Sequence, residues 1–329
     1  MNVKIDRAIY QRWENNHKLA NHITSVVPYI MIAGPTASGK SQLAIELARR
    51  FGGAIINADS LQLYADLTVV TARPQPQETQ DIPHHLFGVY DAARRTSVAE
   101  WLGLAATAIA NVRAAGQLPI IVGGTGMYLQ AGLRGIAPVP DVPSHVHQHC
   151  IGLYQELGGA KFRDTLAGYD ADIAARLADG DSQRLIRAMG VAMATKRPLS
   201  WWQQQPHKGA LVGSVLTIAM MLPRPTLYDR INQRFDRMLM HGAIDEVALL
   251  MTRQLDPGLP LMKALGVAPI AAFLRGDITK DEAALIAKRD SRRYAKRQMT
   301  WIRNNFNAQI TVKKKHYESL YEKIFSLIC

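Results

Sequence analysis

Short apolar runs alternate with amphipathic stretches through the first part of the chain. Residues 29–33 (YIMIA) are apolar throughout, which predicts a strand buried on both faces of a sheet. Residues 42–51 repeat apolar positions four apart and are followed by two glycines, which predicts an amphipathic helix and its end. The same order returns in predicted strands at 54–58 and 119–122 and in predicted helices at 96–115 and from Met127 onward. Strands that alternate with helices predict an α/β fold, with a parallel sheet and helices on both of its faces.

The pattern changes at residues 139–143 (VPDVP), where two prolines indicate a hinge. Helical periodicity alone follows through residues 144–200, with predicted segments near 146–157, 160–167, 171–178 and 182–195. An apolar run at 211–221 returns the chain to the sheet, and helices are predicted again at 226–306. The predicted organisation is an N-terminal extension (1–27), an α/β core (28–141 and 213–306), an all-helical insertion (142–212) and a C-terminal tail (307–329).

Composition narrows the class of protein. Of 329 residues, 48% are hydrophobic and 20% are charged, which is typical of a chain that folds around a core. No stretch approaches the roughly 20 apolar residues that cross a bilayer, and the charged N-terminus does not resemble a secretory signal, so we expect no membrane association. The two cysteines, Cys150 and Cys329, form neither a disulfide framework nor a zinc finger, which favours a cytoplasmic location.

Positive charge is concentrated near the C-terminus. The net charge is +12, and residues 288–315 hold ten basic residues and one acidic residue, Asp290. On a helix, six of these basic residues form two rows with four-residue spacing: Lys288, Arg292 and Lys296, and Arg289, Arg293 and Arg297. Like charges at this spacing repel one another, and a nucleic-acid backbone would relieve that repulsion. The alternatives are a solvated helix face, or rows paired with acidic residues elsewhere in the fold.

A phosphate-binding loop lies between the first predicted strand and the first predicted helix. It fits the pattern G-x-x-x-x-G-K-[ST] in full and places the fold among the P-loop NTPase-like proteins. In this motif, successive backbone N–H groups and a helix N-terminus hold phosphates, Lys40 adds a positive charge, and the Ser41 hydroxyl can bind Mg²⁺. The motif alone leaves open which diphosphate compound binds. Its residues are Gly34, Pro35, Thr36, Ala37, Ser38, Gly39, Lys40 and Ser41.

Two other predicted strands end in polar residues. Asp59 follows the strand at 54–58, and Thr125 lies in the glycine-rich turn after the strand at 119–122. Ligands bind at the carboxyl ends of parallel strands, so we expect Asp59 and Thr125 to share one pocket with Lys40. A carboxylate there can act as a general base or bind Mg²⁺, and the alternative is that Asp59 only caps the next helix.

Nine sequence blocks in order resemble the tRNA dimethylallyltransferases, P-loop isopentenyltransferases that modify adenosine 37 next to the anticodon. The resemblance runs from about residue 29 to residue 306. The blocks are GPTASGKS (34–41), INADSLQLY (56–64), TARP (71–74), PHHL (83–86), VGGTGMYL (122–129), SQRLIRAMGV (182–191), YDRINQRFDRML (228–239), ALGV (264–267) and RYAKRQMTWIR (293–303).

The resemblance implies a catalytic role for several residues. The P-loop would hold the diphosphate of dimethylallyl diphosphate, with Lys40, Arg230 and Mg²⁺ neutralising it as it leaves. Asp59 would be the general base that takes a proton from the adenine N6 amine. Thr125 would support the diphosphate and its bridging oxygen.

The resemblance also implies contacts with tRNA. The helical insertion would bind the anticodon stem, and we expect the protein to act as a monomer. The implied tRNA-binding residues are Asp59, Ser60, Leu61, Gln62, Thr125, Gln183, Arg184, Leu185, Ile186, Arg187, Arg293, Lys296 and Arg297.

Two departures from the family pattern stand out. Arg73 replaces the usual lysine of the TARP block, and residues 178–181 replace a His-Pro-Asn-Asp sequence. Three other functions compete with the tRNA-modifying transferase. They are an adenylate isopentenyltransferase that acts on free nucleotide, a P-loop small-molecule kinase, and an RNA-binding module without catalysis. The helical insertion and the basic helix argue against the first, because a mononucleotide needs neither.

Overall fold

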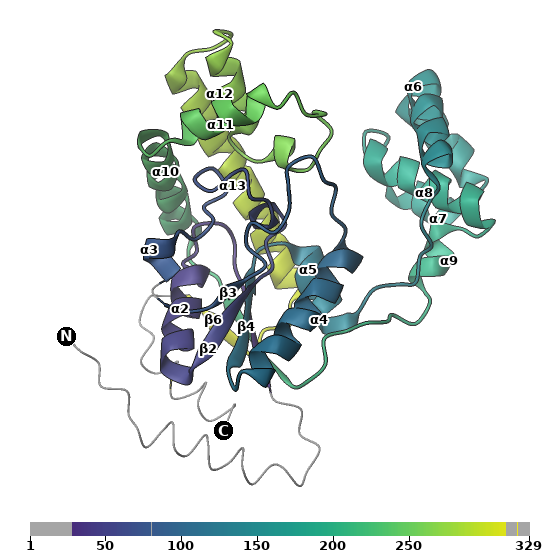
Figure 1. The fold of residues 1–329 in the computed structure, drawn as a ribbon. Helices are drawn as coiled ribbons and strands as arrows, with labels where there is room; N and C mark the ends of the chain where they lie inside the picture. The colour runs from purple at the N-terminus through teal and green to yellow at the C-terminus, as the bar shows by residue number, and fades with distance from the viewer. Residues whose placement is uncertain (1–27, 80, 314–320, 322–329) are drawn as a thin grey trace, which may run out of the picture. The chain divides into compact units, whose positions relative to one another are not determined.

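The computed structural model describes residues 28–79, 81–313 and 321. The chain forms two compact units, one from Met1–Leu133 with Leu211–Cys329 and the other from Arg134–Ala210. The first unit contains a six-stranded parallel sheet in the order β3-β2-β4-β1-β5-β6 (Figure 1). The strands are β1 (Tyr29–Ala33), β2 (Gly53–Asn57), β3 (His84–His85), β4 (Leu118–Gly123), β5 (Val215–Met220) and β6 (Ile310–Val312).

Helices cover both faces of this sheet, so the predicted fold class is confirmed. Ile30 and Ile32 of β1 pack in one core with α2, whereas the intervening Met31 lies close to Gly132 of α5 on the opposite face. The alternation follows from the two-residue period of a strand. The helices between the strands are α2 (Lys40–Phe51), α3 (Pro76–Thr79), α4 (Val98–Ala114) and α5 (Gly126–Arg134), with the 3-10 turn η2 (Leu61–Leu63).

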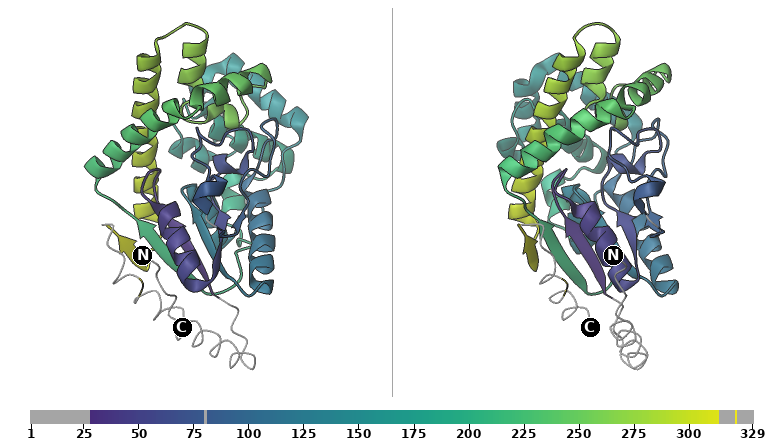
Figure 2. Two further views of the ribbon diagram at one scale, coloured as in Figure 1. Left: turned by 60° about the vertical axis from the view of Figure 1, so that its left-hand side comes forward. Right: turned by 90° about the vertical axis from the view of Figure 1, so that its left-hand side faces the viewer.

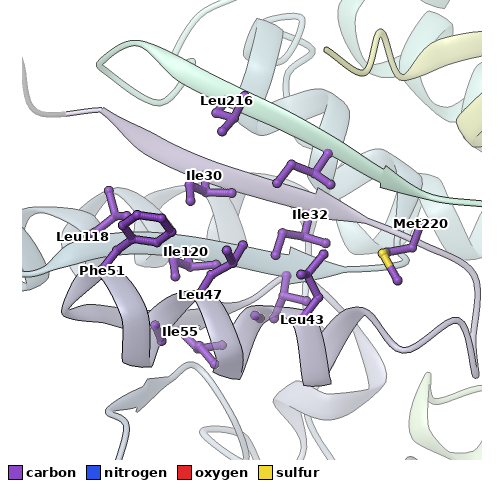
Figure 3. Packing of buried hydrophobic residues seen from close by; sticks show 14 of the residues in the cluster. Ile30, Ile32, Leu43, Leu47, Phe51, Ile55, Leu118, Ile120, Leu216 and Met220 are labelled. Carbon is purple, nitrogen blue, oxygen red and sulfur yellow. The ribbon is translucent and has the colours of Figure 1, made fainter. Parts of the chain in front are cut away.

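The core beneath α2 fixes the position of the P-loop (Figure 3). Leu43 and Leu47, four residues apart on α2, are fully buried against the sheet. Burying a leucine side chain contributes about 1.5–3 kcal/mol, so these residues hold the helix on β1 and β4. Because α2 begins at Lys40, the same packing fixes the lysine at the carboxyl end of β1.

Four helices follow β5 along the chain. They are α10 (Arg224–Met240), α11 (Ala243–Thr252), α12 (Val267–Leu274) and α13 (Lys280–Asn305), with the 3-10 turn η3 (Leu261–Lys263) between α11 and α12. Thr279 and Glu282 form a capping box at the start of α13, which fixes where this long helix begins. In both views of Figure 2, α10 crosses α13. Their shared apolar cluster includes Ile231 and Met299 and packs against Ala37 of the P-loop.

The chain returns to the sheet after α13. Ile310–Val312, inside the segment expected to be a tail, instead forms β6 and pairs with β5. Gln309 anchors this edge, because its side-chain oxygen accepts a hydrogen bond from the backbone N–H of Thr217 at 2.8 Å. A three-residue strand is too short to show a period in sequence, which explains the difference. The predicted extension at 1–27 lies outside the described residues.

The second unit is all-helical. Its core is lined by buried apolar residues such as Phe162, Leu185 and Met189. This unit, Arg134–Ala210, begins and ends earlier in the chain than the predicted insertion at 142–212. Non-helical dihedral angles at Gly158 (φ 70°, ψ 165°) divide the first helix between the two segments predicted there. The helices are α6 (Ser144–Ala167), α7 (Ala171–Arg176), α8 (Ser182–Thr195) and α9 (Leu199–Gln203).

Within the described residues, no helix combines the length and the apolar character needed to cross a membrane.

Candidate active site

The P-loop has the backbone geometry of an anion cradle. Gly39 (φ 93°) and Ala37 (φ 62°) both adopt left-handed conformations, and such strain in a residue other than glycine is concentrated at functional sites. A Cβ at Gly34 would lie 2.5 Å from the Ser38 hydroxyl and 3.0 Å from the Met220 Cβ, so a side chain there would displace the Ser38 hydroxyl. The Ser38 hydroxyl is buried and has no hydrogen-bond partner among the described residues. The loop thus presents an unpaired donor next to its backbone amides.

Lys40 begins α2 directly after this loop. Burial lowers the pKa of Lys40 to about 8 against the attraction of the nearby Asp59 carboxylate, and the Arg234 guanidinium lowers the pKa further. A cation held away from water interacts strongly with an anion that enters the site. The P-loop therefore gains a positive charge where a diphosphate would bind.

Asp59 follows β2 and is held by its own turn. The Asn57 side-chain oxygen accepts the backbone N–H of Asp59 at 2.8 Å. One oxygen of the Asp59 carboxylate accepts the N–H of Leu61 at 3.2 Å. Asp59 thus caps the first N–H of the following 3-10 turn from one position before its N-cap residue, Ser60, and Asp59 also lines a cavity with Thr36 and Arg234. The capping contact orients the carboxylate and is compatible with a catalytic role.

Thr125 connects the ends of β2 and β4. Its hydroxyl accepts the backbone N–H of Ser60 at 3.0 Å, and its own N–H donates to the carbonyl oxygen of Ala58 at 3.3 Å. A Cβ at Gly123 would lie 2.0 Å from that same Ala58 oxygen, so only glycine allows this approach. Asp59 and Thr125 are thus brought to the same edge of the sheet, as the strand pattern predicts.

Two arginines of α10 lie over the P-loop. The Nη1 atom of Arg230 is 3.5 Å from the Ser38 carbonyl oxygen. Arg234, one helical turn later, donates a hydrogen bond to the Thr36 hydroxyl. Burial lowers the pKa of Arg234 to about 10, although Asp59 favours its charged form. Sequence reasoning identified Arg230 and missed Arg234, and the four-residue spacing in DRINQRF is the signal that could have found it.

Residues of this site line two cavities. The smaller, about 60 Å³, is lined by Asp59, Arg234 and apolar side chains including Phe235. The larger, about 580 Å³, is lined by Thr125, the exposed Met127 and a set of residues that includes Ser60, Arg297 and Trp301. Tyr294 lines both cavities, and burial together with the nearby Asp59 charge raises its pKa. Consecutive residues thus line different cavities, Asp59 the smaller and Ser60 the larger.

The predicted basic rows on α13 have different surroundings. Lys288 pairs with Asp236, and Arg292 donates to the Asn232 side chain at 2.7 Å, so this part of one row packs on α10. The residues predicted to bind tRNA are exposed and lie on the same helix: Arg293, Lys296 and Arg297. Pairing with other elements of the fold thus accounts for part of the positive charge and leaves these three side chains at the surface.

The predicted tRNA segment on α8 divides in the same way. Leu185 and Ile186 are buried in the core of the helical unit, so their side chains do not face a partner, contrary to expectation. A helix turns about 100° per residue, so a contiguous block is spread over more than one face, with Leu185 and Ile186 on the buried face and Arg184 and Arg187 outside it. Gln183, Arg184 and Arg187 are exposed and remain available.

Other predicted positions hold loops together. The Gln62 side-chain amide donates to the carbonyl oxygens of Thr71 and Ala72 at 3.0 and 2.9 Å, which commits its N–H groups to the TARP loop. Arg73 donates to the Ala65 oxygen at 3.0 Å and occupies the space beside Gly88. Arg73 is therefore held by contacts within its own loop.

The fold and site together define a P-loop α/β protein with the chemistry for group transfer from a diphosphate: a phosphate loop, a carboxylate and a hydroxyl lie at the ends of three strands. Residues 62–305 match the model of the IPP transferase family, and residues 28–86 match that of isopentenyl transferase. The chain belongs to the IPP transferase family.

Curated relatives extend over most of the chain. The tRNA dimethylallyltransferase of Hyphomonas neptunium is 49% identical over 85% of this chain and 89% of its own length. That of Parvibaculum lavamentivorans is 44% identical over 91% of this chain and 95% of its own.

Solved structures share the fold. The full-length tRNA isopentenylpyrophosphate transferase from Bacillus halodurans has a TM-score of 0.65 at 31% identity, covering 92% of this chain and 96% of that one. A eukaryotic dimethylallyltransferase described as acting on tRNA has a TM-score of 0.78 at 25% identity, covering 91% and 78%.

Proposed function

We propose that this protein transfers the dimethylallyl group of dimethylallyl diphosphate to the N6 amine of adenosine 37 in tRNA. The observation that carries the proposal is the meeting of the P-loop, Asp59 and Thr125 at three strand ends. Its support from outside the site is the similarity to relatives named tRNA dimethylallyltransferase over 85% and 91% of the chain.

Departure of the diphosphate is the first requirement of this reaction. The bond between the allylic carbon and the bridging oxygen breaks, and the diphosphate keeps the electron pair. Lys40 and Arg230 neutralise that growing charge, and the Ser38 hydroxyl and the loop amides donate hydrogen bonds to it. Thr125 supports the bridging oxygen with its hydroxyl.

Attack by the amine is the second requirement. The N6 nitrogen forms a bond to the allylic carbon, and Asp59 accepts the proton that the amine loses. An exocyclic amine is a weak nucleophile, so placement and proton removal both contribute. The adenine leaves its base stack to reach the site, as in other enzymes that modify bases.

Magnesium fits the donor set as a partner of the substrate. Among the described residues, no three His, Cys, Asp or Glu side chains are grouped so as to hold a metal. Mg²⁺ commonly binds through one or two protein oxygens together with substrate phosphates, and the exposed Ser41 hydroxyl in the first turn of α2 is such a donor. When bound there, the ion supplies further neutralisation of the diphosphate.

Recognition of tRNA is assigned to the exposed polar side chains of both units. Gln183, Arg184 and Arg187 of α8 would contact the anticodon stem-loop, and the exposed basic residues of α13 would contact its backbone. We assign the protein to the cytoplasm, where tRNA is modified, and to a monomeric state that light scattering can test.

Nucleoside mass spectrometry tests the proposal. Unmodified tRNA is incubated with the protein and dimethylallyl diphosphate, digested, and examined for N6-(dimethylallyl)adenosine. AMP as acceptor tests the adenylate isopentenyltransferase, and ATP hydrolysis tests the kinase. Product on AMP but none on tRNA would refute the assignment.

A further inference from the structure

We propose that Gln298 of α13 is a positioning residue that fixes the P-loop against the turn carrying Thr125. The expected effects on kcat and KM rest on the proposed function. The expected effect on diphosphate binding does not depend on which reaction the protein catalyses. Gln298 lies beside the exposed basic residues of its helix but is itself only 6% exposed.

Both ends of the Gln298 amide are used. Its Oε1 atom accepts the backbone N–H of Thr36 at 2.9 Å, and its Nε2 atom donates to the carbonyl oxygen of Gly124 at 2.9 Å. Thr36 belongs to the P-loop after β1, and Gly124 belongs to the turn after β4. One side chain therefore joins two strand ends by a donor and an acceptor, which is the property that distinguishes an amide from a carboxylate or an apolar side chain.

The turn after β4 is shaped around this amide. A Cβ at Gly124 would lie 2.3 Å from the Gln298 Nε2 atom and 3.0 Å from the Gly34 carbonyl oxygen. A direct backbone bond between the two loops, from the Gly34 N–H to the Gly123 oxygen, is longer at 3.3 Å. Gly124 thus leaves room for the Gln298 amide, and the amide supplies the shorter contacts between the loops.

Thr36 is held from a second direction by Arg234, which donates to its hydroxyl. The backbone N–H of Thr36 is committed to Gln298 and that of Ser38 to the Pro35 carbonyl oxygen, so the P-loop amides left for a diphosphate are those of Ala37, Gly39, Lys40 and Ser41. The two anchors come from α10 and α13, which pack together against Ala37. The C-terminal helices therefore determine where the diphosphate lies relative to Thr125.

Small displacements of reacting groups are costly to catalysis, because the rate depends on their alignment. Loss of Gln298 should leave the loop folded on α2 but shift it from the Thr125 turn. We expect a lower kcat and a higher KM for dimethylallyl diphosphate, with the KM for tRNA unchanged.

The test compares Gln298→Met with Gln298→Glu. Methionine has a similar shape and makes neither bond. Glutamate keeps an acceptor for the Thr36 N–H and places a second oxygen against the Gly124 carbonyl. We expect each variant to lose at least about tenfold in kcat/KM for dimethylallyl diphosphate. Gln309→Met is the matched control, because Gln309 also accepts a backbone N–H through its side-chain oxygen, but at the sheet edge.

Melting temperature is measured for all three variants. The positioning role is supported if the Gln298 variants lose more kcat/KM for dimethylallyl diphosphate than Gln309→Met does, while their melting temperatures are comparable. The role is overturned if the Gln298 variants and Gln309→Met lose equally in kcat/KM, or if the Gln298 variants have normal kinetics.

A second variant tests the same contact if the Gln298 variants fold poorly. Gly124→Ala places a methyl group against the Gln298 amide, and we expect it to reproduce the kinetic loss. Combined with Gln298→Met it should add less than it costs alone, because both changes act on the Gln298–Gly124 contact, and what it still adds comes from the Gly34 carbonyl oxygen 3.0 Å from the new methyl group. Additive losses would overturn the proposal.

Calorimetric binding of inorganic diphosphate separates this inference from the proposed function. If the wild-type protein binds diphosphate but modifies no tRNA, the proposed function is refuted. The role of Gln298 in positioning the P-loop can then still be tested by diphosphate binding to the variants. Weaker diphosphate binding by Gln298→Met than by Gln309→Met then supports it, and equal binding overturns it.

Discussion

The hydroxyl of Thr125 accepts a hydrogen bond from the backbone N–H of Ser60 at 3.0 Å. The contact joins the turns after β4 and β2, which are 65 residues apart in the chain. The bond holds the threonine hydroxyl, proposed to support the leaving oxygen, against the residue that follows Asp59, the proposed general base.

Thr125→Val should therefore reduce activity with little change of shape. Valine keeps the volume but loses the hydroxyl, so the Ser60 N–H loses its partner at a cost of about 1 kcal/mol. We expect kcat to fall by about 10²-fold, which is typical for loss of one such group at a leaving oxygen. Thr125→Ser, which restores the hydroxyl, should recover most of the rate. A normal kcat for Thr125→Val would exclude a catalytic role for the hydroxyl.

Asp59→Asn should retain the fold and tRNA binding but lose most of the rate. The amide oxygen can still accept the Leu61 N–H, so the turn is preserved. Loss of a general base lowers the rate by about 10²–10⁴-fold. Single-turnover transfer with saturating tRNA measures this step directly. Near-normal transfer would remove Asp59 from the mechanism.

Local features of the site were predictable from the sequence. The P-loop motif is contiguous, and Asp59 and Thr125 each follow a recognisable strand, so the order of elements is sufficient to place them. Gln298 was not predictable in this way, because its bond to Thr36 spans 262 positions, and Arg234 could have been found only through its four-residue spacing from Arg230.

Assigning whole sequence blocks to a function by family resemblance included residues that the structure places in the core. The QRLIR block was assigned to tRNA as a unit, although a helix turns Leu185 and Ile186 into the core of the helical unit. The strand at Ile310–Val312 was missed because its pairing with β5, rather than its own three residues, determines its structure.

Binding of dimethylallyl diphosphate should weaken as the pH rises through about 8. Burial lowers the pKa of Lys40 from 10.5 to about 8, so the free protein loses this charge above that pH, whereas the ligand stays ionised. The anion favours the charged lysine, so binding near pH 8.5 should take up a proton. Calorimetry in buffers of different ionisation enthalpy measures the uptake, and Lys40→Arg should show none.

The same shift gives the sign of a stability effect. The folded pKa of Lys40 lies below its unfolded value, so between pH 8 and 10.5 the unfolded chain binds more protons at this residue. The Lys40 contribution should therefore make the ligand-free protein more stable as the pH rises through that window. Comparison with Lys40→Met by chemical denaturation isolates the contribution. A wild-type stability that falls relative to Lys40→Met over this range would contradict the burial of the charge.

Replacing Arg293 and Arg297 with alanine should raise the KM for tRNA and leave dimethylallyl diphosphate binding intact. Both side chains are exposed on α13, where Arg293 makes a long contact of 3.8 Å with Asp290 and Arg297 lies 5.6 Å from the centre of the Tyr294 ring. Each lost phosphate contact should reduce the slope of log K against log salt by about one unit or less. Lys288→Ala is the matched control on the same helix, because Lys288 pairs with Asp236 of α10. The control should lower the melting temperature and keep the salt slope. An unchanged slope with a lower melting temperature in the double arginine variant would mean that these arginines support the fold, and tRNA would then have to bind elsewhere on the protein.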